Sequence, residues 1–123
     1  MPIQDGSKAP IGKQWNQRPF SWSECPRLGD VYQGQKVGAV GILFGHGGIV
    51  GLDFDGASVD RMLAEWGVEL PPTTTISSGR NGHCLKLFKI PGAYRDRVQT
   101  AKYKTGVIVQ EHGKEVHEQL ELR

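Results

Sequence analysis

Length, composition and charge narrow the class of protein. The chain has 123 residues, 37% of them hydrophobic, which predicts a single domain with one modest core. With 15 Lys and Arg against 13 Asp and Glu, its charge is compatible with weak nucleic-acid binding without requiring it. Cys25 and Cys84 stand outside any paired spacing, which argues against a zinc ribbon or a disulfide framework and indicates a reduced, cytoplasmic chain. No apolar run approaches the ~20 residues of a membrane span, so we expect no membrane partner.

A pair of aspartates follows the first predicted hairpin. Two apolar runs joined by a Gly-rich turn, within residues 40–52, predict a hairpin of two buried strands. Because side chains alternate along a strand, Leu52 and Phe54 should face the core while Asp53 and Asp55 project together from the opposite face. Two neighbouring carboxylates repel each other unless a cation lies between them, and their oxygen atoms suit Mg²⁺ or Mn²⁺. The alternative is a pair of solvated aspartates at a strand end that leads into a helix.

A helix is predicted directly after these aspartates. Apolar residues at positions 59, 62, 63 and 66 lie at helical spacing, which places Trp66 in the core. Ser58 is suited to cap the first turn, and Gly67 is suited to end the helix.

A second hairpin carries a polar turn. Residues 73–77 and 84–89 are typical of strands, and the turn between them holds the residues that we consider for phosphate binding. These candidates are Ser78, Gly79, Arg80 and His83. A turn of this kind offers backbone N–H groups and cationic donors to a phosphate. The alternative is a plain hairpin turn.

The last residues alternate in the manner of a strand. Leu120 and Leu122 should point to one face, so Glu121 points to the other and becomes a candidate third carboxylate. The alternative is an exposed Glu on an edge strand.

Basic residues gather between the second hairpin and this strand. They are Lys86, Lys89, Arg95, Arg97, Lys102 and Lys104. On one surface they would form a track for a phosphate backbone. The alternative is a solvated, mobile loop that is merely basic.

In this order, the motifs resemble the archaeo-eukaryotic primase superfamily and, within it, the N-terminal domain of bifunctional DNA primase/polymerases. The stretch from Lys8 to Trp15 is similar to the family's opening, a Lys-x-Pro shortly before a Trp. Residues 40–55 are similar to its first motif, a Gly-rich hairpin that leads to Asp-x-Asp. Residues 72–88 are similar to the second, a Ser-Gly pair and a later His before an aromatic strand. Residues 120–123 are similar to the third, an acidic residue between two apolar ones with a basic residue after it.

The resemblance implies a fold and an extent. The fold is α+β, with an RRM-like antiparallel or mixed sheet, a helix packed on one face and the acids on the other. Residues 1–123 would form one domain, with an N-terminal flap region at 1–36 and the catalytic sheet at 37–123. The family pattern continues past its third motif, so we expect a fragment truncated at the C-terminus or a minimal form. In either, Glu121 would be poorly held and primer extension weak.

The resemblance also implies an activity. We expect a DNA primase/polymerase that adds nucleotides by two-metal phosphoryl transfer, in the replication of a phage, plasmid or mobile element. Asp53, Asp55 and Glu121 would hold Mg²⁺ or Mn²⁺, residues 78–83 the nucleoside triphosphate, and Lys8 a phosphate of template or nucleotide. The implied partners are a DNA template and primer, nucleoside triphosphates and a helicase module. The alternatives are a non-catalytic nucleic-acid-binding remnant of the fold and a metal-dependent phosphohydrolase.

Overall fold

The chain divides into two compact units. The computed structural model describes residues 1–13, 15, 17, 20–21 and 23–123. One unit comprises Met1–His46 and the other Gly47–Arg123. The second unit contains the sheet that carries the candidate acids.

The first unit is built on a small antiparallel sheet. Its strands are β1 (Pro2–Gln4), β2 (Val31–Tyr32) and β3 (Gln35–Val40), in the order β1-β3-β2. Its buried apolar residues include Pro2, Ile3, Ile11 and Val37, with Val37 only 1% exposed. The strand β3, which shares only Val40 with the strand predicted at residues 40–44, thus pairs inside the first unit.

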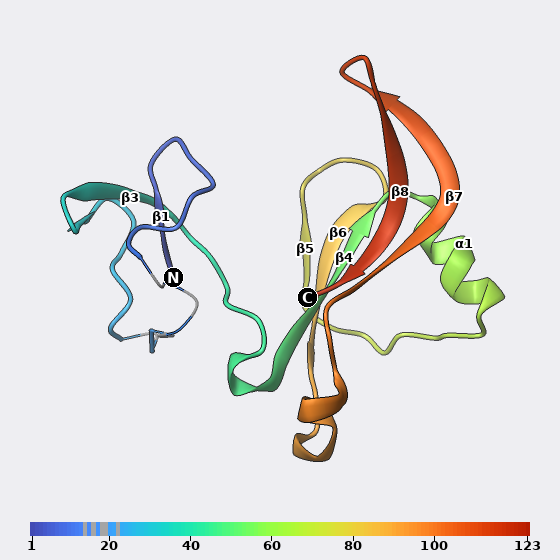
Figure 1. Cartoon of the computed structure of the whole chain (residues 1–123), viewed down its shortest axis with the longest axis horizontal. Coiled ribbons are helices and arrows are strands. Elements are labelled where there is room, and N and C mark those ends of the chain that lie inside the picture. The colour runs from blue at the N-terminus through green and yellow to red at the C-terminus, as the bar shows by residue number, and fades with distance from the viewer. Residues whose placement is uncertain (14, 16, 18–19, 22) are drawn as a thin grey trace. The chain divides into compact units, whose positions relative to one another are not determined.

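The second unit is a five-stranded sheet with an α-helix on one face (Figure 1). The strand order is β5-β6-β4-β8-β7, and every neighbouring pair is antiparallel. The short η1 (His46–Gly48) spans the boundary between the units, and the second unit then contains β4 (Ile49–Asp55), α1 (Ser58–Glu65), β5 (Thr75–Ser77), β6 (His83–Lys89), η2 (Gly92–Arg97), β7 (Ala101–Glu111) and β8 (Lys114–Leu122).

The predicted hairpin within residues 40–52 is wrong. Its second strand exists as β4, but residues 41–43 form no strand, and Val40 ends β3. The reason lies in pairing, because β4 has β6 on one edge and β8 on the other. Both hydrogen-bonding edges of β4 are therefore taken by strands from the C-terminal half of the chain.

The core of the second unit lies between α1 and the sheet. Its buried side chains are Phe54, Val59, Met62, Leu63 and Leu120. Phe54 is 2% exposed and Val59 is fully buried, which agrees with the predicted helical and strand periodicities. Burial of side chains of this size stabilises a fold by about 1.5 to 3 kcal/mol each.

Both ends of α1 differ from their predictions. Ser58 is the first helical residue, not the cap, and its N–H donates to Glu118 Oε2 at 2.8 Å while its hydroxyl bonds the same oxygen. Trp66 is 51% exposed and contacts Tyr103 edge-on, with ring centroids 5.4 Å apart. It lies outside the core because α1 ends at Glu65, and Gly67 closes the helix as predicted, with φ +67°.

The longest hairpin of the unit, β7–β8, extends beyond the rest of the sheet (Figure 1). Only residues 119–122 of β8 pair with β4 in the ladder, so β7 and the remainder of β8 have each other as partners.

Candidate functional site

Asp53, Asp55 and Glu121 form one carboxylate cluster on the sheet face opposite α1. Asp53 and Asp55 flank the buried Phe54 on β4, so both project from the other face, as predicted. Glu121 of β8 lies directly opposite Asp53 in the antiparallel register. Side chains at such paired positions lie on the same face, with Cβ atoms about 4.5 to 5.5 Å apart.

Glu121 is not on an edge strand, and the expectation that it is poorly held is wrong. β8 lies between β4 and β7, so Glu121 has Asp53 as its neighbour on one side and Lys102 on the other. The residue is only 8% exposed. Pairing on both edges holds this terminal segment, which the alternation of two leucines could not reveal.

Two cations neutralise part of the cluster. Arg123 Nη2 donates to Asp53 Oδ2 at 2.9 Å and to Glu121 Oε2 at 3.2 Å. Lys102 Nζ lies 3.3 Å from the same Glu121 oxygen. Sequence reasoning did not assign these roles, although Arg123 stands two residues after Glu121 and therefore on the same strand face.

The pKa of Asp53 is raised above its ordinary value. Burial is the largest cause, the neighbouring charge of Asp55 is the next, and Glu121 adds to it. Arg123 acts in the opposite direction but does not cancel the shift. Burial and the neighbouring carboxylates therefore disfavour the ionised form of Asp53, and a further cation beside it would favour that form.

The donor chemistry of the cluster fits Mg²⁺ or Mn²⁺. Both ions prefer oxygen ligands, and three carboxylates share one face. No three His, Cys, Asp or Glu side chains within the described part of the chain are arranged to hold a metal ion as they stand. Arg123 lies between Asp53 and Glu121 instead, so a metal ion there requires its guanidinium group to turn away.

The predicted polar turn, residues 78–83, lies beside the carboxylate cluster. A cavity of about 240 Å³ is lined by Asp53 and Asp55 together with Ser78, Arg80 and His83. The register of β4 and β6 explains this, since Asp55 pairs directly with His83. The structure thus brings together the two predicted aspartates and three of the predicted phosphate-binding residues.

Gly82 fixes how the turn meets β4. Its φ is +72°, and a Cβ atom there would lie 2.3 Å from the Ala57 backbone nitrogen. Gly56 N–H donates to the Gly82 carbonyl at 3.1 Å. A glycine at this position is therefore required by the close approach of the two loops.

Arg80 and His83 are the donors that the turn presents. The N–H groups of Gly79 and Arg80 are bonded to the hydroxyls of Ser77 and Ser78, at 3.1 and 3.5 Å. Arg80 Nη2 lies 3.1 Å from His83 Nδ1, and because guanidinium groups only donate, Nδ1 accepts. A neutral His83 then carries its proton on Nε2.

Glu111 is a residue of this region that sequence reasoning missed. Arg80 Nη1 donates to both Glu111 carboxylate oxygens, each at 3.2 Å. Nothing in the local sequence indicates the contact, because Glu111 stands 31 residues from Arg80 at the tip of another hairpin.

The basic residues do not form one surface. Lys86 lies on the α1 side of the sheet, with Nζ 4.6 Å from the centre of the Phe54 ring, whereas Lys102 contacts Glu121 on the opposite side. Arg95 and Arg97 belong to η2, and Lys89 ends β6. Lys104 lies two residues after Lys102 on β7 and pairs with Gln119 of β8. Lys102 and Lys104 are therefore the part of the predicted track that adjoins the carboxylate cluster.

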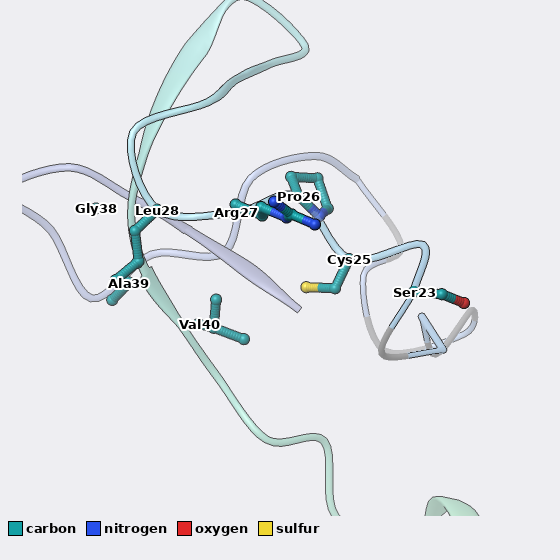
Figure 2. A pocket seen from close by; sticks show the side chains of 8 residues that line it. All are labelled: Ser23, Cys25, Pro26, Arg27, Leu28, Gly38, Ala39 and Val40. Carbon is teal, nitrogen blue, oxygen red and sulfur yellow. The ribbon is translucent and has the colours of Figure 1, made fainter.

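The first unit holds a larger cavity. It has a volume of about 790 Å³, and Figure 2 shows the Cys25 side chain pointing toward Val40. Its walls are Ser23, Cys25, Pro26, Arg27, Leu28, Gly38, Ala39 and Val40. None of these is a carboxylate, so this cavity does not match the predicted chemistry. Lys8 is exposed in the same unit, and its role stays a prediction.

Comparison with protein families agrees with this geometry. The family model for bifunctional DNA primase/polymerase, N-terminal, matches residues 1–123. The chain belongs to this family. No curated protein and no solved structure matches the chain.

Membership confirms the predicted resemblance and the coarse features that follow from it. The α+β fold with antiparallel sheets suits a small primase/polymerase domain, and the family implies interaction with DNA and nucleotides. Across the described residues, no helix has the length and apolar character to cross a membrane.

Proposed function

We propose that this chain is a DNA primase/polymerase that adds nucleotides to a primer under the direction of a template. One observation carries the proposal, which is that Asp53 and Asp55 line the same cavity as Arg80 and His83. Carboxylates for divalent cations and cationic donors for phosphates are the two components that nucleotidyl transfer requires.

Each group has a distinct task in this proposal. Asp53, Asp55 and Glu121 would hold two divalent metal ions, which when bound activate the primer 3′-oxygen and neutralise charge on the leaving pyrophosphate. Arg80 and the Nε2–H of His83 would bind the triphosphate of the incoming nucleotide. The protein does little covalent work in such a reaction, so positioning and charge neutralisation supply most of the rate.

The strand order of the sheet supports this division of tasks. Asp53 and Asp55 lie on the central strand, between the strand that carries His83 and the strand that carries Glu121. The proposal places the triphosphate over β6 and its turn, and the primer end toward β8. Lys102 and Lys104 on β7 then adjoin the side on which the nucleic acid would lie.

A non-catalytic nucleic-acid-binding role is the second candidate. The observation in its favour is that Arg123 and Lys102 already lie against the carboxylates. If these cations stay in place, the face binds nucleic acid without holding metal ions. The predicted RRM-like detail, a phage, plasmid or mobile-element setting, a helicase partner and a cytoplasmic location are further parts of the proposal.

Primer extension tests the proposal directly. A labelled primer on a longer template, with deoxynucleoside triphosphates and Mg²⁺ or Mn²⁺, should be lengthened by the wild-type chain and not by an Asp53→Asn, Asp55→Asn variant. Asp60→Asn, which removes an exposed acid from α1, is the matched control and should extend normally. Template binding without extension would favour the non-catalytic role. Phosphate release without primer or template would favour a phosphohydrolase.

A further inference from the structure

We propose that Glu111 is an internal competitor for the phosphates of the nucleotide, occupying Arg80 and His83 until a triphosphate displaces it. The inference rests on the proposed function in one respect, that Arg80 and His83 bind phosphate. It adds a residue outside every motif of the sequence and assigns it a regulatory effect on nucleotide affinity.

The contacts of Glu111 support this role. Its two carboxylate oxygens both accept from Arg80 Nη1 at 3.2 Å, and its Oε1 lies 3.9 Å from His83 Nε2. These are the same two side chains that line the cavity with Asp53 and Asp55. Glu111 therefore faces the donors that the proposal assigns to the nucleotide.

A carboxylate and a phosphate compete for such donors because they present the same chemistry. Guanidinium groups bind either anion through a fork of N–H bonds, and the Nε2–H of His83 donates equally well to both. A phosphate oxygen cannot occupy this place while the carboxylate does. Binding of a triphosphate therefore requires Glu111 to leave.

The pair is exposed enough to be displaced. The Arg80 side chain is 56% exposed and that of Glu111 is 30% exposed, so solvent screens their attraction. A triphosphate carries several charges where Glu111 carries one. The exchange is therefore favourable when nucleotide is present, and Glu111 lowers the affinity without abolishing binding.

The β7–β8 hairpin gives Glu111 a way to move. Glu111 is the last residue of β7, followed by the turn at His112 and Gly113, both with positive φ. The β7–β8 register shifts between Lys104 and Ile108, where Gly106 has φ +87°. Beyond this irregularity the hairpin lies outside the ladder of β4, so its tip can swing away from Arg80 while residues 119–122 stay paired.

Calorimetric titration with inorganic tripolyphosphate, without divalent metal, isolates this effect from metal binding. Glu111→Gln keeps the shape of the side chain and removes its charge. We expect it to bind tripolyphosphate about 3- to 10-fold more tightly than the wild-type chain, in line with the modest strength of exposed ion pairs. Glu115→Gln, which removes an exposed acid from β8 of the same hairpin, is the matched control and should leave the affinity unchanged.

The outcomes separate the inference from the proposed function. An unchanged or weakened affinity in Glu111→Gln, or an equal gain in Glu115→Gln, would overturn the role of Glu111 while leaving the phosphate site intact. In an Arg80→Gln background, adding Glu111→Gln should no longer increase the affinity for tripolyphosphate. An increase that persists in this background would also overturn the role of Glu111. If neither the wild-type chain nor Glu111→Gln binds tripolyphosphate, the proposed phosphate site fails and the inference fails with it.

Discussion

The carboxylate cluster and the turn at residues 78–83 are two charged regions of one cavity, but they are held in different ways. Asp53 and Glu121 belong to adjacent strands, each with ladder partners on both edges. Arg80 and Ser78 belong to a loop, and the position of Arg80 depends on contacts between exposed side chains.

The carboxylates are therefore held rigidly by the sheet, whereas the donors of the turn already have an anionic partner. The ladder fixes where the carboxylates stand, and burial together with the neighbouring carboxylates raises the pKa of Asp53. Arg80, by contrast, has its charge satisfied by Glu111 before any ligand arrives. Substitution of the carboxylates should therefore abolish metal binding, whereas substitutions around the turn should change the affinity for nucleotide by a limited factor.

The largest effect is expected from the carboxylate cluster itself. An Asp53→Ala, Asp55→Ala double variant should lose measurable Mn²⁺ binding in a calorimetric titration, because both changes remove oxygen ligands from the same strand face. Thermal unfolding should show no loss of stability, since the partly buried Asp53 carboxylate, whose pKa is raised, opposes folding when ionised. Equal Mn²⁺ affinity in the two proteins would contradict a metal site here.

The next largest effect is expected from His83 on the turn side of the cavity. His83→Ala should weaken binding of a nucleoside triphosphate by tenfold or more, because a charge-assisted hydrogen bond contributes about 1.5 to 3 kcal/mol. Mn²⁺ binding should change far less. His117→Ala, an exposed histidine of β8, serves as the control. Unchanged nucleotide affinity in a folded His83→Ala variant would make this histidine structural.

A smaller change of opposite sign is expected from Arg123. Arg123→Gln should bind Mn²⁺ about 3- to 10-fold more tightly, since it removes the cation that lies between Asp53 and Glu121. The gain is modest because solvent screens the charge of the Arg123 side chain. Arg61→Gln on α1, whose side chain pairs with Glu65, removes the same charge far from the cluster and should have no effect. Weaker Mn²⁺ binding in Arg123→Gln would show that the guanidinium group positions the carboxylates for the metal.

The smallest effect is expected from Glu118, which holds the start of α1 through Ser58. Its pKa is lowered, chiefly by the hydrogen bonds from the Ser58 hydroxyl and backbone N–H. A lowered pKa in the folded state means that this stabilisation is present above the ordinary value and is lost as pH falls through the folded-state pKa. Glu118→Gln should lower the free energy of unfolding by about 1 kcal/mol at neutral pH, as loss of a helix cap does. The loss should be smaller in acid, where the wild-type carboxylate is itself protonated. Chemical denaturation at the two pH values measures the difference, and an equal cost at both would contradict it.

Local periodicity predicted the parts of the site that lie within one strand. The alternation of Leu52, Asp53, Phe54 and Asp55 placed both acids on one face because side-chain direction depends only on position along the strand. The turn before His83 was predicted for the same kind of reason, since its glycines and flanking strands are local features.

Local signals failed where distant partners decide the outcome. Residues 40–44 have the composition of a buried strand, but β6 and β8 occupy the edges of β4. Trp66 has helical spacing, yet the helix ends one residue before it. In each case strand pairing or packing with distant residues decided the structure, and the spacing of apolar residues along the chain does not report on such contacts.

The sequence by itself determined which residues are acidic, which face of a strand they share and to which family the motifs belong, because these follow from residue type and periodicity. Only the tertiary structure decided that Glu121 is interior and opposite Asp53, and that Glu111 reaches Arg80. Those facts depend on strand order, which joins residues tens of positions apart through backbone hydrogen bonds. Because any strand edge offers the same donors and acceptors, the partner is selected by the packing of the whole sheet.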